Sequence, residues 1–182
     1  MAVQPSNVSS SAASAARPRV VVVMGSDSDL EVMRPAAEIL AELGIPVQMR
    51  VLSAHRTPED AAAFARQAAG EGVQALIAGA GGAAHLAGFL AAHTWLPVIG
   101  VPVQSGPLAG LDALYSTVQM PPGVPVATVG INNARNAGLL AAQILAVSNG
   151  KVRAALEAFR QRQAAGVRAK DERVRQEAFP TQ

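Results

Sequence analysis

Short apolar runs alternate with longer amphipathic segments along most of the chain. Residues Val20 to Met24 form a continuous, mostly β-branched run, which is typical of a strand buried on both faces. Apolar residues then recur at helical spacing from Leu30 to Leu43, and Gly44 is a typical C-cap. The same order recurs and predicts further strands at 45–52, 74–78, 97–101 and 124–129, with helices at 57–69, 85–93, 111–119, 133–147 and 151–163. This alternation predicts an α/β fold, in which a five-stranded parallel sheet is covered by helices on both faces.

The length and composition indicate one domain with two tails. The chain has 182 residues, of which 50% are hydrophobic and 15% charged, enough for one sizeable core. We expect a disordered, Ser- and Ala-rich tail at 1–18, a single domain at 19–165 that includes a C-terminal helix at 151–165, and a charged tail at 166–182. Neither an export signal nor an apolar run of about 18 residues is recognisable. The sequence therefore predicts a cytoplasmic protein without a membrane partner.

The residue counts exclude several chemistries. The chain has no Cys, so it has neither disulfides nor a thiolate metal site, and its two Lys, Lys151 and Lys170, lie near the C-terminus. The three histidines lack the spacing of a zinc site, so we expect no metal. Positive charge is concentrated in residues 151–182, which contain eight Lys/Arg and four Asp/Glu. Residues 18–150 contain six Lys/Arg and nine Asp/Glu. With one Trp and one Tyr, this distribution argues against a nucleic-acid partner.

Polar and small residues follow the predicted strands, at the edge where parallel sheets bind ligands. After the first strand, GSDSD offers hydroxyls from Ser26 and Ser28 at a helix N-terminus, which suits a phosphate. Asp27 or Asp29 then suits ribose hydroxyls; alternatively Ser28 or Asp29 only caps the helix.

The loops after the next two strands, SAHRTP and GAGGAAH, carry the other candidate groups. Arg56 suits a phosphate or carboxylate, and His55 can move a proton near neutral pH. The alternative is a solvated polar turn. The glycines of the second loop allow a flat ligand to approach the backbone, or simply form a tight junction. His85 is expected to begin a helix and His93 to be structural.

In combination, these segments resemble a known family. VVVMGSDSD, SAHRTP, AGAGGAAHL, PVIGVPVQS, LYSTVQMPPGVPVATV and NAGLLAAQIL are similar, in order and spacing over residues 19–160, to the bacterial N5-carboxyaminoimidazole ribonucleotide mutases of purine biosynthesis. A related branch, which carboxylates aminoimidazole ribonucleotide directly with carbon dioxide, typically has SAHKGP in place of SAHRTP. The sequence has the mutase form of this loop.

The resemblance implies a flavodoxin-like three-layer αβα sandwich that assembles as a homo-octamer, with C-terminal helices reaching across neighbours. It implies an isomerase that moves a carboxylate from the exocyclic nitrogen of an imidazole ribonucleotide to ring carbon C4, with no cofactor. His55 matches the catalytic histidine. The positions that match the substrate-binding residues are Ser26, Asp29 and Arg56, with Ser53 and the backbone of Gly81, Gly82, Ala83 and Ala84 beside them.

Two other functions remain open at this stage. A non-catalytic nucleotide-binding module would explain GSDSD and Arg56 but leaves His55 without a task. The second alternative is a carboxylase that uses carbon dioxide directly. If His55 is not the proton-transfer group, His85 is the next candidate.

Overall fold

The fold is built on a five-stranded, wholly parallel sheet, seen in a computed structural model that describes residues 19–177. Its strands are β1 (Val20–Met24), β2 (Val47–Val51), β3 (Ala75–Gly81), β4 (Val98–Val103) and β5 (Ala127–Thr128). Their order across the sheet is β2-β1-β3-β4-β5, the flavodoxin-like arrangement. The predicted parallel sheet is confirmed. The tail expected at 1–18 lies outside the described residues.

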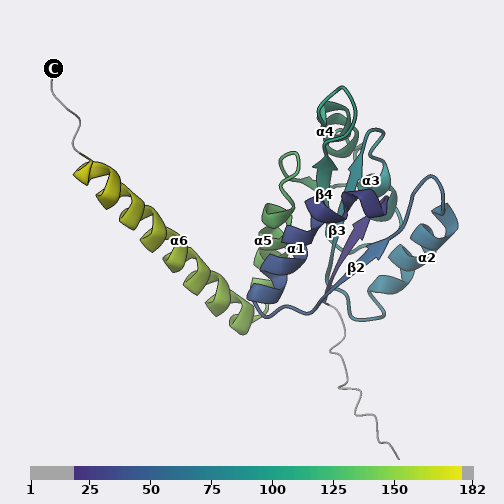
Figure 1. Cartoon of the computed structure of the whole chain (residues 1–182). Coiled ribbons are helices and arrows are strands. Elements are labelled where there is room, and N and C mark those ends of the chain that lie inside the picture. Colours follow the sequence, from purple (N-terminus) through teal and green to yellow (C-terminus); the bar gives the residue numbers. More distant parts are fainter. Residues whose placement is uncertain (1–18, 178–182) are drawn as a thin grey trace, which may run out of the picture.

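Helices cover both faces of this sheet, as the alternation predicted (Figure 1). They are α1 (Leu30–Glu42), α2 (Pro58–Ala68), α3 (Leu86–Ala91), α4 (Leu111–Val118), α5 (Ala134–Ala146) and α6 (Gly150–Gln176), with a short 3-10 turn, η1 (Asp27–Asp29), before α1. Helices α1 and α5 pack together on one face, and α2 and α3 lie on the other. The predicted three-layer sandwich is therefore confirmed.

The β-branched run of β1 explains why this strand occupies the interior. Val20, Val22 and Met24 belong to the core cluster under α1 and α5. Val21 and Val23 point the other way and belong to the cluster under α2 and α3. All five side chains are at most 1% exposed, as expected for a strand covered on both faces.

Two strands are longer than the sequence indicated. β3 and β4 continue to Gly81 and Val103, whereas the pattern predicted ends near residues 78 and 101. Glycines disfavour strands locally, but Gly79 and Gly81 pair with Val101 and Val103 of the neighbouring strand. At the edge of the sheet, β5 is shorter than predicted and contains only two of the six residues expected in it.

Helix α6 runs to Gln176, well past the end predicted at residues 163–165, so the segment 166–176 of the expected charged tail is helical. A lone glycine, Gly166, costs a helix only about 1 kcal/mol, and its Ala, Arg and Lys neighbours favour helix. The early turns pack against the body through Val152, Leu156 and Phe159. Beyond Phe159 the described helix is exposed and extends away from the sheet (Figure 1).

The strand order places a crevice at the carboxyl ends of β1 and β3. From β1 the chain crosses to β2, which pairs with one edge of β1. It then returns to β3, which pairs with the opposite edge of β1. Because consecutive loops diverge at such a switch point, they leave room for a ligand between them. None of the helices within residues 19–177 combines the length and apolar character needed to cross a bilayer.

Candidate active site

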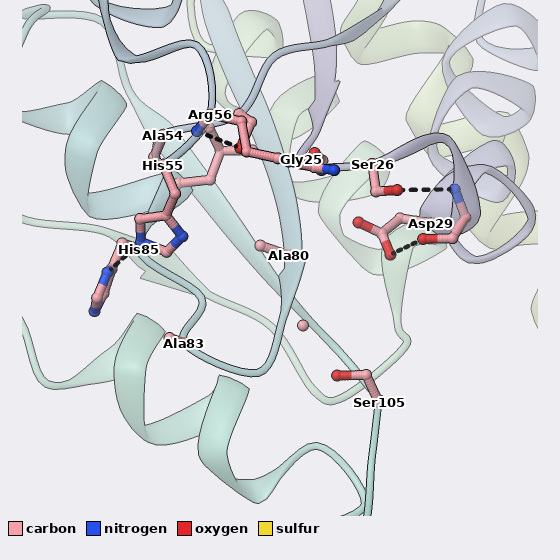
Figure 2. Close-up of a pocket in the computed structure, with 14 residues that line it drawn as sticks. Gly25, Ser26, Asp29, Ala54, His55, Arg56, Ala80, Ala83, His85 and Ser105 are labelled. Carbon is pink, nitrogen blue, oxygen red and sulfur yellow. Dashed lines mark hydrogen bonds between the residues drawn. The ribbon is translucent and has the colours of Figure 1, made fainter.

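A cavity of about 380 Å³ lies at this switch point, and loops from four strands form its wall (Figure 2). The residues that line it are Gly25, Ser26, Ser28 and Asp29 after β1; Ser53, Ala54, His55 and Arg56 after β2; Ala80, Gly81, Ala83, His85 and Leu86 at the end of β3 and beyond; and Ser105 after β4. The structure thus brings together seven predicted site residues: Ser26, Asp29, Ser53, His55, Arg56, Gly81 and Ala83.

The loop after β1 places the carboxylate of Asp29 at this cavity, where one of its oxygens accepts a hydrogen bond from Ser28 Oγ at 3.4 Å. Ser26, and not Ser28 or Asp29, is the capping residue, because its Oγ accepts a hydrogen bond from the Ser28 N–H at 3.4 Å. Asp29 makes no side-chain cap bond at the start of α1. Partial burial raises the pKa of Asp29, although hydrogen bonds from the Ser26 backbone and the Ser28 side chain, and then the nearby Arg56 guanidinium, oppose the shift. A half-buried carboxylate without a capping task is suited to accept hydrogen bonds from a ligand.

Hydrogen bonds within the loop after β2 fix its shape. The Ser53 N–H donates to Thr57 Oγ1 at 3.0 Å, and that hydroxyl donates back to the Ser53 carbonyl at 3.3 Å. The Arg56 N–H donates to Ser53 Oγ at 3.1 Å. Thr57 stands at the N-cap position of α2, as predicted, but its side chain closes this turn instead of capping the helix. The turn therefore holds His55 and Arg56 in place from both sides.

The Arg56 side chain connects two of the loops. Its Nη2 donates to the Gly25 carbonyl at 2.7 Å, and its Nε donates to Ser53 Oγ at 3.4 Å. Figure 2 shows the guanidinium directed along the cavity wall toward Gly25 and Ser26. A guanidinium has five N–H donors, so two such bonds leave others for an anion. Arg56 is thus held in a defined direction before any ligand arrives.

His55 is paired with a second histidine, His85, which the sequence analysis considered only as the alternative proton-transfer group. His55 Nε2 lies 2.7 Å from His85 Nδ1, and the two rings meet edge to face at 87°. His85 stands just before α3, at the helix start predicted for it. The signal available in the sequence was that both residues follow strands that end at the same sheet edge. His93 lies outside this cavity, and its Nδ1 is 2.8 Å from the Phe89 carbonyl oxygen.

The Gly/Ala loop contributes only part of what was expected. Gly82 and Ala84 do not line the cavity, because the chain turns at Gly82 with φ +60° and Ala84 is buried. The Ala84 N–H is also used within the loop, where it donates to the Gly82 carbonyl at 2.8 Å.

Ser105, which the sequence analysis did not single out, lies against this loop. A Cβ added to Gly81 would be 2.5 Å from Ser105 Oγ, so any side chain at this end of β3 would force Ser105 to move. Ser105 is the last residue of PVIGVPVQS, one of the segments that carry the family resemblance, but nothing in the spacing of that segment indicated this contact. Within residues 19–177, no three metal-ligating side chains gather into a site.

Comparisons with known proteins agree on one family. Residues 19–166 match the family described as AIR carboxylase. The chain is 61% identical over 155 residues to the N5-carboxyaminoimidazole ribonucleotide mutase of Mycobacterium tuberculosis, a match covering 85% of this chain and 89% of the relative. It is 53% identical over 159 residues to the Thermotoga maritima protein of the same name, covering 87% and 93%. The crystal structure of Treponema denticola PurE superposes with a TM-score of 0.79 at 29% identity, covering 86% of this chain and 98% of that one.

Proposed function

The chain belongs to the AIR carboxylase family, and we propose that it is an isomerase converting N5-carboxyaminoimidazole ribonucleotide to 4-carboxy-5-aminoimidazole ribonucleotide in purine biosynthesis. One observation supports the proposal beyond the family match: His55, whose imidazole can transfer a proton, lines the same cavity as the guanidinium of Arg56 and the carboxylate of Asp29. A nucleotide-binding module would need Arg56 and Asp29 but would have no use for His55.

The reaction needs one group that both gives and takes a proton. Protonated His55 donates a proton to the exocyclic nitrogen as the N–carboxylate bond breaks and carbon dioxide leaves. Ring carbon C4 of the resulting amine attacks the retained carbon dioxide, and neutral His55 then removes the C4 proton. The histidine returns to its starting protonation state, so no external acid or base is consumed.

The remaining residues of the wall are assigned to binding. We assign Arg56 to the phosphate, because a guanidinium forms strong charge-assisted bonds with phosphate oxygens. Asp29 accepts hydrogen bonds from ribose hydroxyls, and Ser26 and Ser53 donate hydroxyls beside them. Gly81 and Ala83 have small side chains or none, so the part of the cavity wall at the end of β3 leaves room for carbon dioxide. Gly82 and Ala84 support this loop from outside the wall.

The activity is tested by giving the purified protein N5-carboxyaminoimidazole ribonucleotide and following the formation of the C4-carboxylated product. The family description also favours a second candidate, direct carboxylation of aminoimidazole ribonucleotide. Supplying that compound with bicarbonate distinguishes the two reactions. Turnover from the carboxylated substrate with little from the parent amine supports the mutase, and the reverse result supports the carboxylase.

The role of His55 is tested by His55→Asn, because Asn is well accepted in a polar turn. Loss of a general acid–base group lowers kcat by about 10²- to 10⁴-fold. The affinity for the C4-carboxylated product should change little, since Arg56 and Asp29 remain. Circular dichroism checks the fold. If kcat stays above about a tenth of the wild-type value, the assignment to His55 is wrong.

We also infer that the chain assembles into a homo-octamer and acts in the cytoplasm, where phosphorylated intermediates of nucleotide synthesis occur. The exposed half of α6 supports assembly, because Val167 and Val174 are 65% and 51% exposed there. Removing residues 163–182 should lower the mass measured by light scattering while the circular dichroism of the α/β body is retained. An unchanged mass would contradict a role for this half of α6.

A further inference from the structure

The histidine pair offers an inference that rests on the proposed function and goes beyond it. His55 Nε2 is within hydrogen-bonding distance of His85 Nδ1, at 2.7 Å, so one of these nitrogens carries a proton and the other accepts it. The two nitrogens of an imidazole point in different directions. Figure 2 shows His85 on the far side of His55 from Ser26 and Asp29. When Nε2 faces His85, the nitrogen left for a ligand is therefore His55 Nδ1.

The direction of this hydrogen bond decides what His55 can do. If His85 Nδ1–H donates to His55 Nε2, neutral His55 carries its proton on Nδ1 and has no lone pair for the ligand. On the ligand side it could then only donate a hydrogen bond, because the N–H of a neutral imidazole is too weak an acid to release its proton near neutral pH. If His55 Nε2–H donates to His85 Nδ1, neutral His55 has its lone pair on Nδ1 and can take a proton there. It can also return that proton from the same nitrogen without disturbing the pair.

We propose that His85 is a positioning residue: its Nδ1 accepts the His55 Nε2–H, holds the ring, and keeps the working lone pair of His55 on Nδ1. His85 then carries its own proton on Nε2. His85 is exposed and also borders a second cavity of about 370 Å³, where water can accept that proton's hydrogen bond. The arrangement serves the purpose of a carboxylate behind a catalytic histidine, but with a neutral acceptor.

The surroundings of His85 agree with this role. It precedes α3 and makes no side-chain cap bond, so its ring is not engaged in starting the helix. The second cavity is lined by Ala54, Gly88, Phe89, Ser116 and Met120 besides the two histidines. Ser116 is the one residue among those five whose side chain has a hydrogen-bond donor, and its hydroxyl donates to the Asp112 carbonyl at 2.8 Å. No side chain of that lining therefore competes with His55 for the His85 Nδ1 lone pair.

Two variants of His85 distinguish its role as a hydrogen-bond acceptor from a role of its ring in packing. The Asn Oδ1 atom occupies nearly the place of His Nδ1, so His85→Asn keeps an acceptor. His85→Phe keeps the size and shape of a ring but removes the acceptor. We expect kcat to fall by about 2- to 13-fold in His85→Phe, the range of one net hydrogen bond, with KM nearly unchanged. His85→Asn should keep most of the wild-type kcat.

A second measurement does not depend on turnover. The chain has only three histidines, so ¹⁵N-histidine labelling and single variants assign every imidazole nitrogen by NMR. In the wild type and in His85→Asn at a pH where His55 is neutral, the His55 proton should reside on Nε2. In His85→Phe the shifts of its two nitrogens should move toward each other, as the tautomers mix.

The matched controls are His93→Asn and His93→Phe, which alter the histidine outside the cavity and should leave kcat and the His55 shifts unchanged. The inference is overturned if His85→Phe retains kcat and His85→Asn loses it, because that order indicates packing. It is also overturned if His55 is protonated on Nδ1 in the neutral wild type. If the wild type has no mutase turnover, the proposed function fails, and the tautomer measurement still decides the role of His85.

Discussion

Replacing Arg56 with Ala gives a sharp test of how this site binds a ribonucleotide. The guanidinium is already oriented by its bonds to the Gly25 carbonyl and Ser53 Oγ, at 2.7 and 3.4 Å. Because the Arg56 side chain needs little further ordering, a hydrogen bond from it to phosphate should contribute its whole free energy to binding. One hydrogen bond to a charged group is worth about 1.5–3 kcal/mol, so Arg56→Ala should weaken binding by about 10- to 150-fold.

The choice of ligands separates phosphate recognition from loop organisation. Calorimetry would compare the C4-carboxylated product with its dephosphorylated nucleoside, in the wild type and in Arg56→Ala. If Arg56 contacts the phosphate, the substitution should weaken binding of the nucleotide by about 10- to 150-fold and binding of the nucleoside by less than about 3-fold. Arg56→Lys should recover only part of the loss, because an ammonium cannot replace the planar fork.

Arg66→Ala is the matched control, since it removes the same charge from an exposed position on α2, outside the cavity. An equal loss for nucleotide and nucleoside in Arg56→Ala would refute the phosphate contact, and would mean that Arg56 only joins the loops after β1 and β2. Wild-type affinity for both ligands would refute either role.

Two further substitutions test the energetics of the fold around the site. Burial raises the folded-state pKa of Asp29 above its ordinary value of 3.8, so ionised Asp29 lowers stability as pH rises through that pKa. Urea unfolding should therefore find Asp29→Asn more stable than the wild type at pH 7, with the gain vanishing below pH 3.8, and a pH-independent difference would contradict this. Gly138→Ala should lower the free energy of unfolding by about 1–2 kcal/mol, because overpacking outweighs the better helix propensity of alanine. Its Cβ would lie 2.4 Å from Ile39 Cγ2 and 2.8 Å from the Ala36 carbonyl oxygen, so a gain in stability would show that α1 and α5 separate easily.

The sequence by itself determined the parallel α/β architecture and half of the residues that line the candidate site. A run such as Val20–Met24 is apolar on both faces and can only be covered from two sides, and the loops SAHRTP and GSDSD stand directly after strands. Parallel strands end at one edge, so Ser26, Asp29, His55 and Arg56 were bound to meet there. These are consequences of local periodicity and chain order.

The tertiary structure decided which atoms of that edge touch. Contacts between residues far apart in sequence have no periodic signal. Chain order placed His55 and His85 at the same sheet edge, but it could not predict that their rings form a pair, nor that Ser105 approaches Gly81. The ends of β3 and α6 also differed from prediction, since strand pairing and continued helical hydrogen bonding outweigh the local preference of a glycine. Periodicity records which face of an element is buried, whereas a contact between loops depends on how the whole chain packs.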